Sequence, residues 1–264
     1  MTGERACDPF DGLRGVPVAG GLLAVASAGP PASEADAVVL AVHGVASSHA
    51  VWRTVARELN GIGGSRTCLI APDLRGRARS AGLPGPYGQA AHVADMLAVL
   101  DDAGAGPVVL LGHSMGGYVA CALAARHPDR VSAVVLVDGG VAMPVYPSDI
   151  ADALVEPMVD SALELPRLPF ATVEEHVAQW RAHPAFARDW NEDVDDYARY
   201  GLKGEPGALH VASSEAAVRA DVSEMAHDEA SMRVVDGVRA PIQLLRASRG
   251  MRDDAPMVPR YLLE

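Results

Sequence analysis

The sequence predicts an α/β fold: a mostly parallel, doubly wound sheet with helices on both faces and a helical cap inserted after the sixth strand. Short apolar, β-branched runs alternate with Ala-rich helical stretches as far as residue 137. Residues 140–235 then contain amphipathic stretches and many prolines, before a strand pattern returns at 241–247. We therefore expect a core of residues 1–139 and 236–264 and a cap of residues 140–235.

Seven strands are expected from the apolar runs. The first two enclose Gly20-Gly21 and predict a hairpin, and the third is continuously apolar, as a strand buried on both faces should be. The expected strands are 16–18, 22–27, 37–42, 67–71, 108–111, 133–137 and 241–247. Helices are expected at 48–59, 90–102, 118–127 and 172–183, the last with Thr172 as its N-cap.

Composition and charge argue against several kinds of partner. A net charge of -12 argues against nucleic acid, whose phosphates need clustered Lys and Arg. The N-terminus carries acids where a signal peptide needs a basic start, and no apolar run approaches the span of a bilayer. Cys7, Cys68 and Cys121 suit neither a metal site nor a disulfide framework, and we expect Cys68 and Cys121 to fill core space. We expect a cytoplasmic protein that acts on a small molecule, with no membrane partner, cofactor or metal; homodimer formation stays open.

The segment 112–117, Gly-His-Ser-Met-Gly-Gly, carries the chemistry. It places Ser114 between two glycines directly after an apolar run and before an Ala-rich helix, which is the sequence form of a nucleophile elbow. A serine hydroxyl must project from such a sharp turn for a base to take its proton. Gly112 and Gly116 leave room for the strained turn.

Two backbone N–H groups are expected to form an oxyanion hole beside this serine. Val45 follows the third strand, and Met115 opens the helix after the elbow. His43 and His113 flank the same turns, and we expect them to pack and hydrogen-bond there rather than to act as the base.

The chain resembles the α/β-hydrolase superfamily over nearly its whole length. The matching motifs are His43-Gly44, Asp73-Leu74-Arg75-Gly76, the 112–117 segment and Leu136-Val137-Asp138. Ala78 replaces a second glycine that is common in the family, within a charged segment, 73–80, that we interpret as a salt-bridged structural loop. The resemblance implies an eight-stranded sheet, a cap after the sixth strand, and Ser-Asp/Glu-His chemistry without a cofactor.

The triad acid has more than one candidate. The resemblance places it after the seventh strand, but Gly250 occupies the position where it commonly falls, and Asp253 and Asp254 lie further on. Some relatives place the acid at the end of the sixth strand, where this sequence has Asp138 before Gly139. An acid there can orient and stabilise an imidazolium. We place Asp138 ahead of Asp254 and Asp253, although an Asp at a strand end can also simply cap a turn.

The triad histidine is not found in the sequence, because none follows His227. We expect the chain to be truncated at Glu264, with a later segment supplying the histidine; the alternative is a degenerate hydrolase that cannot activate its serine. His210 and His227 fall in or near the cap, and His49 and His92 on expected surface helices, so none of them is expected to substitute.

These features predict a cofactor-independent serine hydrolase that cleaves an ester or lactone of a medium-sized apolar substrate through an acyl-enzyme on Ser114. Trp180, Trp190 and Tyr200 in the cap are the candidates for substrate binding, although each could equally serve only to hold the cap helices together. Two alternatives stay open. One is a non-catalytic ligand-binding homologue that lacks the base, and the other is a C–C hydrolase or cofactor-free oxygenase on the same fold.

Overall fold

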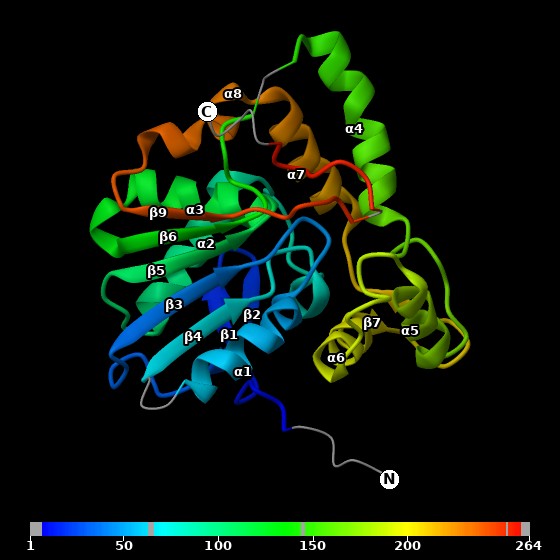
Figure 1. The fold of residues 1–264 in the computed structure, drawn as a ribbon, viewed down its shortest axis with the longest axis horizontal. Coiled ribbons are helices and arrows are strands. Elements are labelled where there is room, and N and C mark those ends of the chain that lie inside the picture. Colours follow the sequence, from blue (N-terminus) through cyan, green and yellow to red (C-terminus); the bar gives the residue numbers. More distant parts are fainter. Residues whose placement is uncertain (1–6, 63–65, 144–145, 252, 260–264) are drawn as a thin grey trace.

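A mostly parallel sheet runs through the centre of the protein (Figure 1). The computed structural model describes residues 7–62, 66–143, 146–251 and 253–259. Within these residues seven strands form one sheet in the order β1-β2-β4-β3-β5-β6-β9. The pairs β1–β2 and β2–β4 are antiparallel, and all other neighbours are parallel. The predicted α/β fold with a mostly parallel sheet is confirmed.

The strands coincide with the expected apolar runs, and their ends differ by at most three residues. Gly20, at φ +90°, lies in the turn of the predicted hairpin and adopts a backbone conformation that other residues rarely reach. The strands are β1 (Leu13–Val18), β2 (Gly21–Ala28), β3 (Ala37–Val42), β4 (Thr67–Pro72), β5 (Val108–His113), β6 (Val131–Val137) and β9 (Ile242–Leu245).

Helices cover both faces of the sheet because both faces are apolar. Leu110 belongs to one buried cluster, with α2 (Gln89–Asp102) and α3 (Met115–Arg126). Leu111 belongs to the other, with the 3-10 helix η1 (His49–Trp52) and α1 (Arg53–Gly61). Successive side chains of a strand point to opposite faces, so one strand serves both clusters. Burying each such leucine contributes about 1.5–3 kcal/mol.

Cysteine placement agrees with the sequence analysis. Cys68 and Cys121 are buried among the apolar side chains of the larger cluster, as expected, whereas Cys7 is exposed. Among the helices in the described ranges, none is long and apolar enough to cross a membrane.

The segment between β6 and β9 is mainly helical. Thr172 caps α5 as predicted, with its hydroxyl accepting a hydrogen bond from the Glu175 N–H at 3.1 Å. Two strands of two residues each were not predicted, because such short pairs leave no periodicity to detect. The elements are α4 (Ser148–Leu163), α5 (Val173–Ala182), α6 (Glu192–Tyr200), β7 (Leu202–Lys203), β8 (His210–Val211), α7 (Glu215–His227), α8 (Glu229–Met232) and the 3-10 helix η4 (Val234–Gly237). The division into core and cap stays a prediction.

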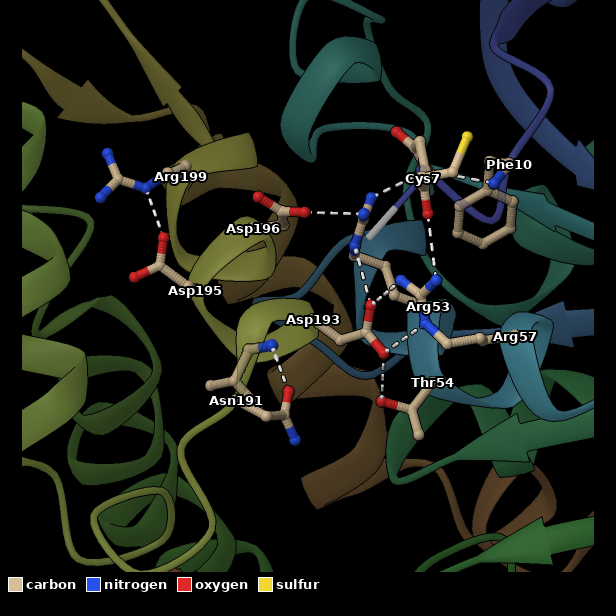
Figure 2. Close-up of polar contacts among 12 residues, drawn as sticks. Cys7, Phe10, Arg53, Thr54, Arg57, Asn191, Asp193, Asp195, Asp196 and Arg199 are labelled. Atoms are coloured by element: carbon tan, nitrogen blue, oxygen red, sulfur yellow. Dashed lines mark hydrogen bonds and ion pairs between the residues drawn. The ribbon is translucent and has the colours of Figure 1, made fainter. Parts of the chain in front are cut away.

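An ionic cluster joins α6 to α1, as Figure 2 shows. Arg57 donates to both carboxylate oxygens of Asp193, at 2.7 and 3.3 Å, and Thr54 Oγ1 donates to the same carboxylate at 3.0 Å. The largely buried Arg53 pairs with Asp196 at 2.7 Å and with Asp8 at 2.9 Å. Bidentate and buried pairs fix geometry better than isolated surface pairs. These contacts therefore hold α6 against the core.

Candidate active site

Ser114 lies on a strained turn between β5 and α3. Its φ is +53°, a left-handed conformation that costs a non-glycine residue about 1–3 kcal/mol. Two backbone hydrogen bonds hold the turn: the Ser114 N–H donates to Val137 O at 3.0 Å, and the Ser114 carbonyl accepts from the Gly117 N–H at 2.9 Å. The strand, turn and helix thus follow in the order that a nucleophile elbow requires.

Glycines allow the surrounding backbone to approach this turn closely. A Cβ on Gly116 would lie 2.1 Å from Val42 O, and one on Gly112 would lie 2.5 Å from Gly116 O. Gly139, after β6, packs against the turn itself, since its Cβ would lie 2.6 Å from Ser114 Cα. The clashing atoms are all backbone, so they cannot rotate away. The expectation that Gly112 and Gly116 make room for the elbow is confirmed.

The predicted oxyanion donors lie on the two segments that flank Ser114. The Met115 N–H belongs to the first turn of α3, where backbone donors lack intrahelical acceptors. Val45 follows β3, whose neighbour in the sheet is β5. Within the described ranges, neither N–H has a protein acceptor. Their joint action on one substrate oxygen stays a prediction.

His43 fixes the peptide that carries the Val45 N–H. Its Nδ1 donates to Gly44 O at 2.8 Å, and its Nε2 accepts from the Leu74 N–H at 2.9 Å. A trans peptide directs its N–H opposite to its C=O, so anchoring Gly44 O sets the direction of the Val45 N–H. Complete burial lowers the pKa of His43 to about 3, which keeps the ring neutral and both hydrogen bonds intact. His43 is structural, as expected.

The three candidate acids occupy different surroundings. Asp138 ends β6, with its N–H donating to Leu245 O at 2.8 Å and its Oδ1 accepting from the Ala247 N–H at 3.3 Å. It precedes Gly139, which touches the Ser114 backbone. Asp253 is exposed and pairs with Arg249 at 2.6 Å and with Arg188 at 3.4 Å.

Asp254 is also exposed, in the loop after β9. Of the three candidates, Asp138 is the one whose next residue, Gly139, packs against the Ser114 backbone.

The sequence-based placement of two histidines is wrong. His49 and His92 were expected on surface helices, but both are buried, because each ring binds a buried carboxylate. His49 Nδ1 lies 2.9 Å from Asp73 Oδ1, and His92 Nε2 lies 3.1 Å from Asp221 Oδ2.

No histidine supplies an evident base for Ser114. His113 is largely buried, which lowers its pKa. His210 lies on β8 and the exposed His227 pairs with Asp152 on α4. In the described part of the chain, no histidine is hydrogen-bonded to Ser114 Oγ.

The three predicted substrate-binding aromatics do not form one surface. Trp180 packs against Phe186 and Tyr197 inside the insertion, with ring centroids 5.1 and 5.5 Å apart. The Trp190 ring lies under the guanidinium of Arg181 at 4.9 Å. These contacts hold the insertion together, and their role toward a substrate stays a prediction.

Tyr200 instead joins the insertion to the end of β4. Its hydroxyl donates to Asp73 Oδ2 at 2.6 Å, and its ring meets His49 edge-on at 4.5 Å. Burial, followed by the Asp73 carboxylate, raises the pKa of Tyr200 well above its usual value. Tyr197 of the same helix reaches Ser47 at 3.2 Å, two residues beyond Val45. α6 therefore lies over the loops at the carboxyl ends of β3 and β4.

The charged segment 73–80 forms the salt-bridged loop that the sequence predicted. Arg75 pairs with Asp95 of α2 at 2.5 Å, and Arg77 pairs with Asp221 of α7 at 2.5 Å; all four side chains are at most 2% exposed. The segment carries one aspartate and three arginines at alternate positions. Nothing in the sequence identified Asp221 as a partner, because it lies 144 residues away on a helix that also carries Glu215 and Glu224.

Comparison with known proteins identifies relatives of the chain. A family model described as alpha/beta hydrolase fold matches residues 37–191. Lipase LipV of Mycobacterium tuberculosis is 44% identical over 105 residues, which cover 40% of this chain and 38% of that protein. The putative carbamate hydrolase RutD of Caulobacter segnis is 36% identical over 104 residues, covering 39% of this chain and 38% of that protein. The matched part therefore spans well under half of either relative.

Solved structures share the same architecture. The thioesterase domain from a curacin biosynthetic pathway superposes with a TM-score of 0.71 at 22% identity, covering 89% of this chain and 82% of that domain. At this identity the likeness supports the fold alone.

The packing at the elbow predicts the effect of adding one methyl group. Gly116→Ala should lower the free energy of unfolding by about 3 kcal/mol or more, because the new Cβ meets two backbone carbonyls. Gly82→Ala is the matched control, since a Cβ there has nothing within 4 Å and should change stability by less than about 1 kcal/mol. Urea unfolding followed by circular dichroism measures both. Equal stability of the two variants would contradict the packing described.

The buried ring of His43 predicts a pH-dependent stability. The pKa of His43 in the folded protein lies below its unfolded value of 6.5. As pH falls below 6.5, the unfolded state therefore binds a proton that the folded state does not bind. The advantage of the wild type over His43→Gln should therefore shrink by about 2 kcal/mol between pH 7.5 and 5, measured by urea unfolding.

A matched control, His227→Gln, should show a pH dependence of stability with the opposite sign. The pKa of the exposed His227 is raised, first by the Ser223 carbonyl and then by Asp152. Its contribution is therefore present at low pH and lost as pH rises, and the advantage over His227→Gln should grow as pH falls. A gap between wild type and His43→Gln that does not vary with pH would show that His43 titrates normally in the folded protein.

Proposed function

The chain belongs to the alpha/beta hydrolase family, and we propose that it is a serine hydrolase that forms an acyl-enzyme on Ser114. The observation that supports this most is the strained backbone of Ser114, placed beside the Val45 and Met115 N–H groups, for which the described residues offer no acceptor. Strain of this kind persists only where the surrounding structure imposes it, and it is concentrated at functional sites.

The mechanism follows from the groups around the elbow. Ser114 Oγ attacks the substrate carbonyl carbon while a base takes its proton, and the carbonyl oxygen becomes an oxyanion. The N–H groups of Val45 and Met115 donate to this oxygen, as preorganised donors do in acyl transfer. The base returns its proton to the leaving group, and water then attacks the acyl carbon to release the acid and free Ser114. No cofactor enters any of these steps.

The base and its orienting acid complete the proposal. The base is a histidine in this proposal; His43 is not assigned to it because its ring is bound by backbone groups, nor are His49 and His92, whose rings bind carboxylates. Asp138 is the acid, because it follows β6 next to the glycine that touches Ser114, whereas Asp253 is neutralised by two exposed arginines. A carboxylate in this position orients the imidazole and stabilises the imidazolium.

The substrate class is an ester or lactone of medium size. Two of the curated relatives are named as a lipase and a putative carbamate hydrolase, and these names support hydrolysis as the class of reaction. In this proposal Trp180 and Trp190, which are partly exposed as well as packed within the insertion, contact the substrate, and Tyr200 lies at the junction with the core. A cap that excludes water would favour a compact, largely apolar acyl group.

A second function is a ligand-binding homologue without turnover. The observation that favours it is that, in the described ranges, no histidine ring is hydrogen-bonded to Ser114 Oγ. The two functions differ in the activation of Ser114, so a reagent that reports the nucleophilicity of the serine distinguishes them.

Ser114 should react with a fluorophosphonate that labels activated serines. Intact-protein mass spectrometry should show one adduct on the wild type and none on Ser114→Ala, with hydrolysis of p-nitrophenyl acyl esters lost in parallel. Ser132→Ala is the control, because Ser132 is exposed on β6 and should label like the wild type. A folded wild type that neither labels nor hydrolyses esters would favour the binding protein.

The acid assignment predicts that one of three substitutions matters. Asp138→Asn keeps an oxygen to accept from the Ala247 N–H but removes the charge, and should slow ester hydrolysis by up to about 10⁴-fold. Asp253→Asn and Asp254→Asn are the matched controls and should stay within about three-fold of the wild type. Initial rates on one ester measure all three. Wild-type turnover by Asp138→Asn, or a large loss in Asp253→Asn or Asp254→Asn, would refute the assignment.

A further inference from the structure

The loop that carries the Val45 N–H is held from both sides. On one side His43 anchors Gly44 O, which also accepts from the Ser47 N–H at 3.3 Å. On the other side Arg77 Nε donates to Val45 O at 2.8 Å. The two peptide groups that meet at Val45 are thus fixed by two side chains that are both completely or almost completely buried.

Arg77 is itself held rigidly. Its Nη1 donates to Arg75 O at 2.9 Å, and its Nη2 lies 2.5 Å from Asp221 Oδ2. A guanidinium presents its donors in one rigid plane, so these contacts also fix the direction of Nε. With a side chain only 1% exposed, Arg77 has no freedom to swing toward solvent.

Its counter-ion comes from the insertion. Asp221 lies on α7 and also accepts from the Gly88 N–H at 2.8 Å and from His92 Nε2 at 3.1 Å. Both groups belong to the start of α2 in the core. The carboxylate is therefore fixed by the core as well as by Arg77. A buried ion pair of this kind gives little net stability, because desolvation offsets the attraction. Its main effect is to fix the positions of the two side chains.

We propose that Arg77 is a positioning residue for the oxyanion hole, acting through the Val45 carbonyl, with Asp221 of α7 as its counter-ion. This inference rests on the proposed function. An oxyanion hole works through donors that are already in place when charge develops, and small displacements of such groups slow the reaction strongly. Because Arg77 is paired with Asp221, the position of the Val45 N–H depends on the inserted segment.

The chain provides a matched control two residues away. Arg75 is as buried as Arg77 and makes a short pair with Asp95, but its side chain donates to Ala19, Pro84 and Pro86 carbonyls and not to the Val45 loop. Arg75→Lys and Arg77→Lys each remove one buried guanidinium and keep the charge. A general loss of packing should affect the two alike, whereas loss of positioning should appear in Arg77→Lys alone.

Two readouts on the purified protein decide the matter. Fluorophosphonate labelling should give a maximal rate that is about ten-fold lower in Arg77→Lys with an unchanged half-saturating concentration, since the donors act on the transition state. In ¹⁵N relaxation measurements, the Val45 amide order parameter should fall from about 0.85 to below about 0.7. Arg75→Lys should change neither. Asp221→Asn, which still accepts from the Gly88 N–H, should reproduce the effect if Arg77→Lys does not fold.

The outcomes separate this inference from the proposed function. If the wild type labels, and both the rate and the Val45 order parameter are unchanged in Arg77→Lys or fall equally in Arg75→Lys, the positioning role is wrong and the hydrolase proposal stands. If the wild type does not label, the hydrolase proposal fails. The order parameter then decides alone: loss of order at Val45 confined to Arg77→Lys supports the positioning role, and unchanged order overturns it.

Discussion

The left-handed backbone of Ser114 is the constraint on which the rest of the structure depends. It is tolerated because the ends of β3, β5 and β6 converge there without side chains between them: Gly116 lies against Val42 O and Gly139 against Ser114 itself. The same convergence sets the first N–H groups of α3 beside the serine, where the helix dipole favours negative charge. Backbone packing thus creates both the strained turn at the serine and the setting for an oxyanion.

Buried ion pairs connect the region around the elbow to the insertion. The Arg77–Asp221 pair links α7 to the loop after β4, and Arg77 also donates to Val45 O in the loop after β3. The Arg53–Asp196 pair links α6 to α1. Charged groups removed from water must be paired, so the insertion has to lie where these ion pairs can form. Both ion pairs attach the insertion to the core close to a loop at the carboxyl end of the sheet, and that is where substrates bind in open α/β folds.

The sequence revealed features that are local and missed those that join distant segments. The strands and the elbow were predictable because apolar runs and the spacing of glycines about Ser114 are encoded in consecutive residues. The burial of His49 and His92 was not, because it depends on carboxylates that the fold supplies from Asp73 and Asp221. The sequence likewise did not decide which aspartate is the triad acid. The structure favours Asp138, because the next residue, Gly139, packs against Ser114.

The central claim, that Ser114 is a nucleophile served by two backbone donors, is tested most directly by a crystal structure of the protein treated with an alkyl phosphonate. The account predicts a covalent bond from phosphorus to Ser114 Oγ. It also predicts a phosphoryl oxygen about 2.7–3.1 Å from the N atoms of both Val45 and Met115. A phosphonate attached to another residue, or a phosphoryl oxygen directed away from both N–H groups, would contradict it.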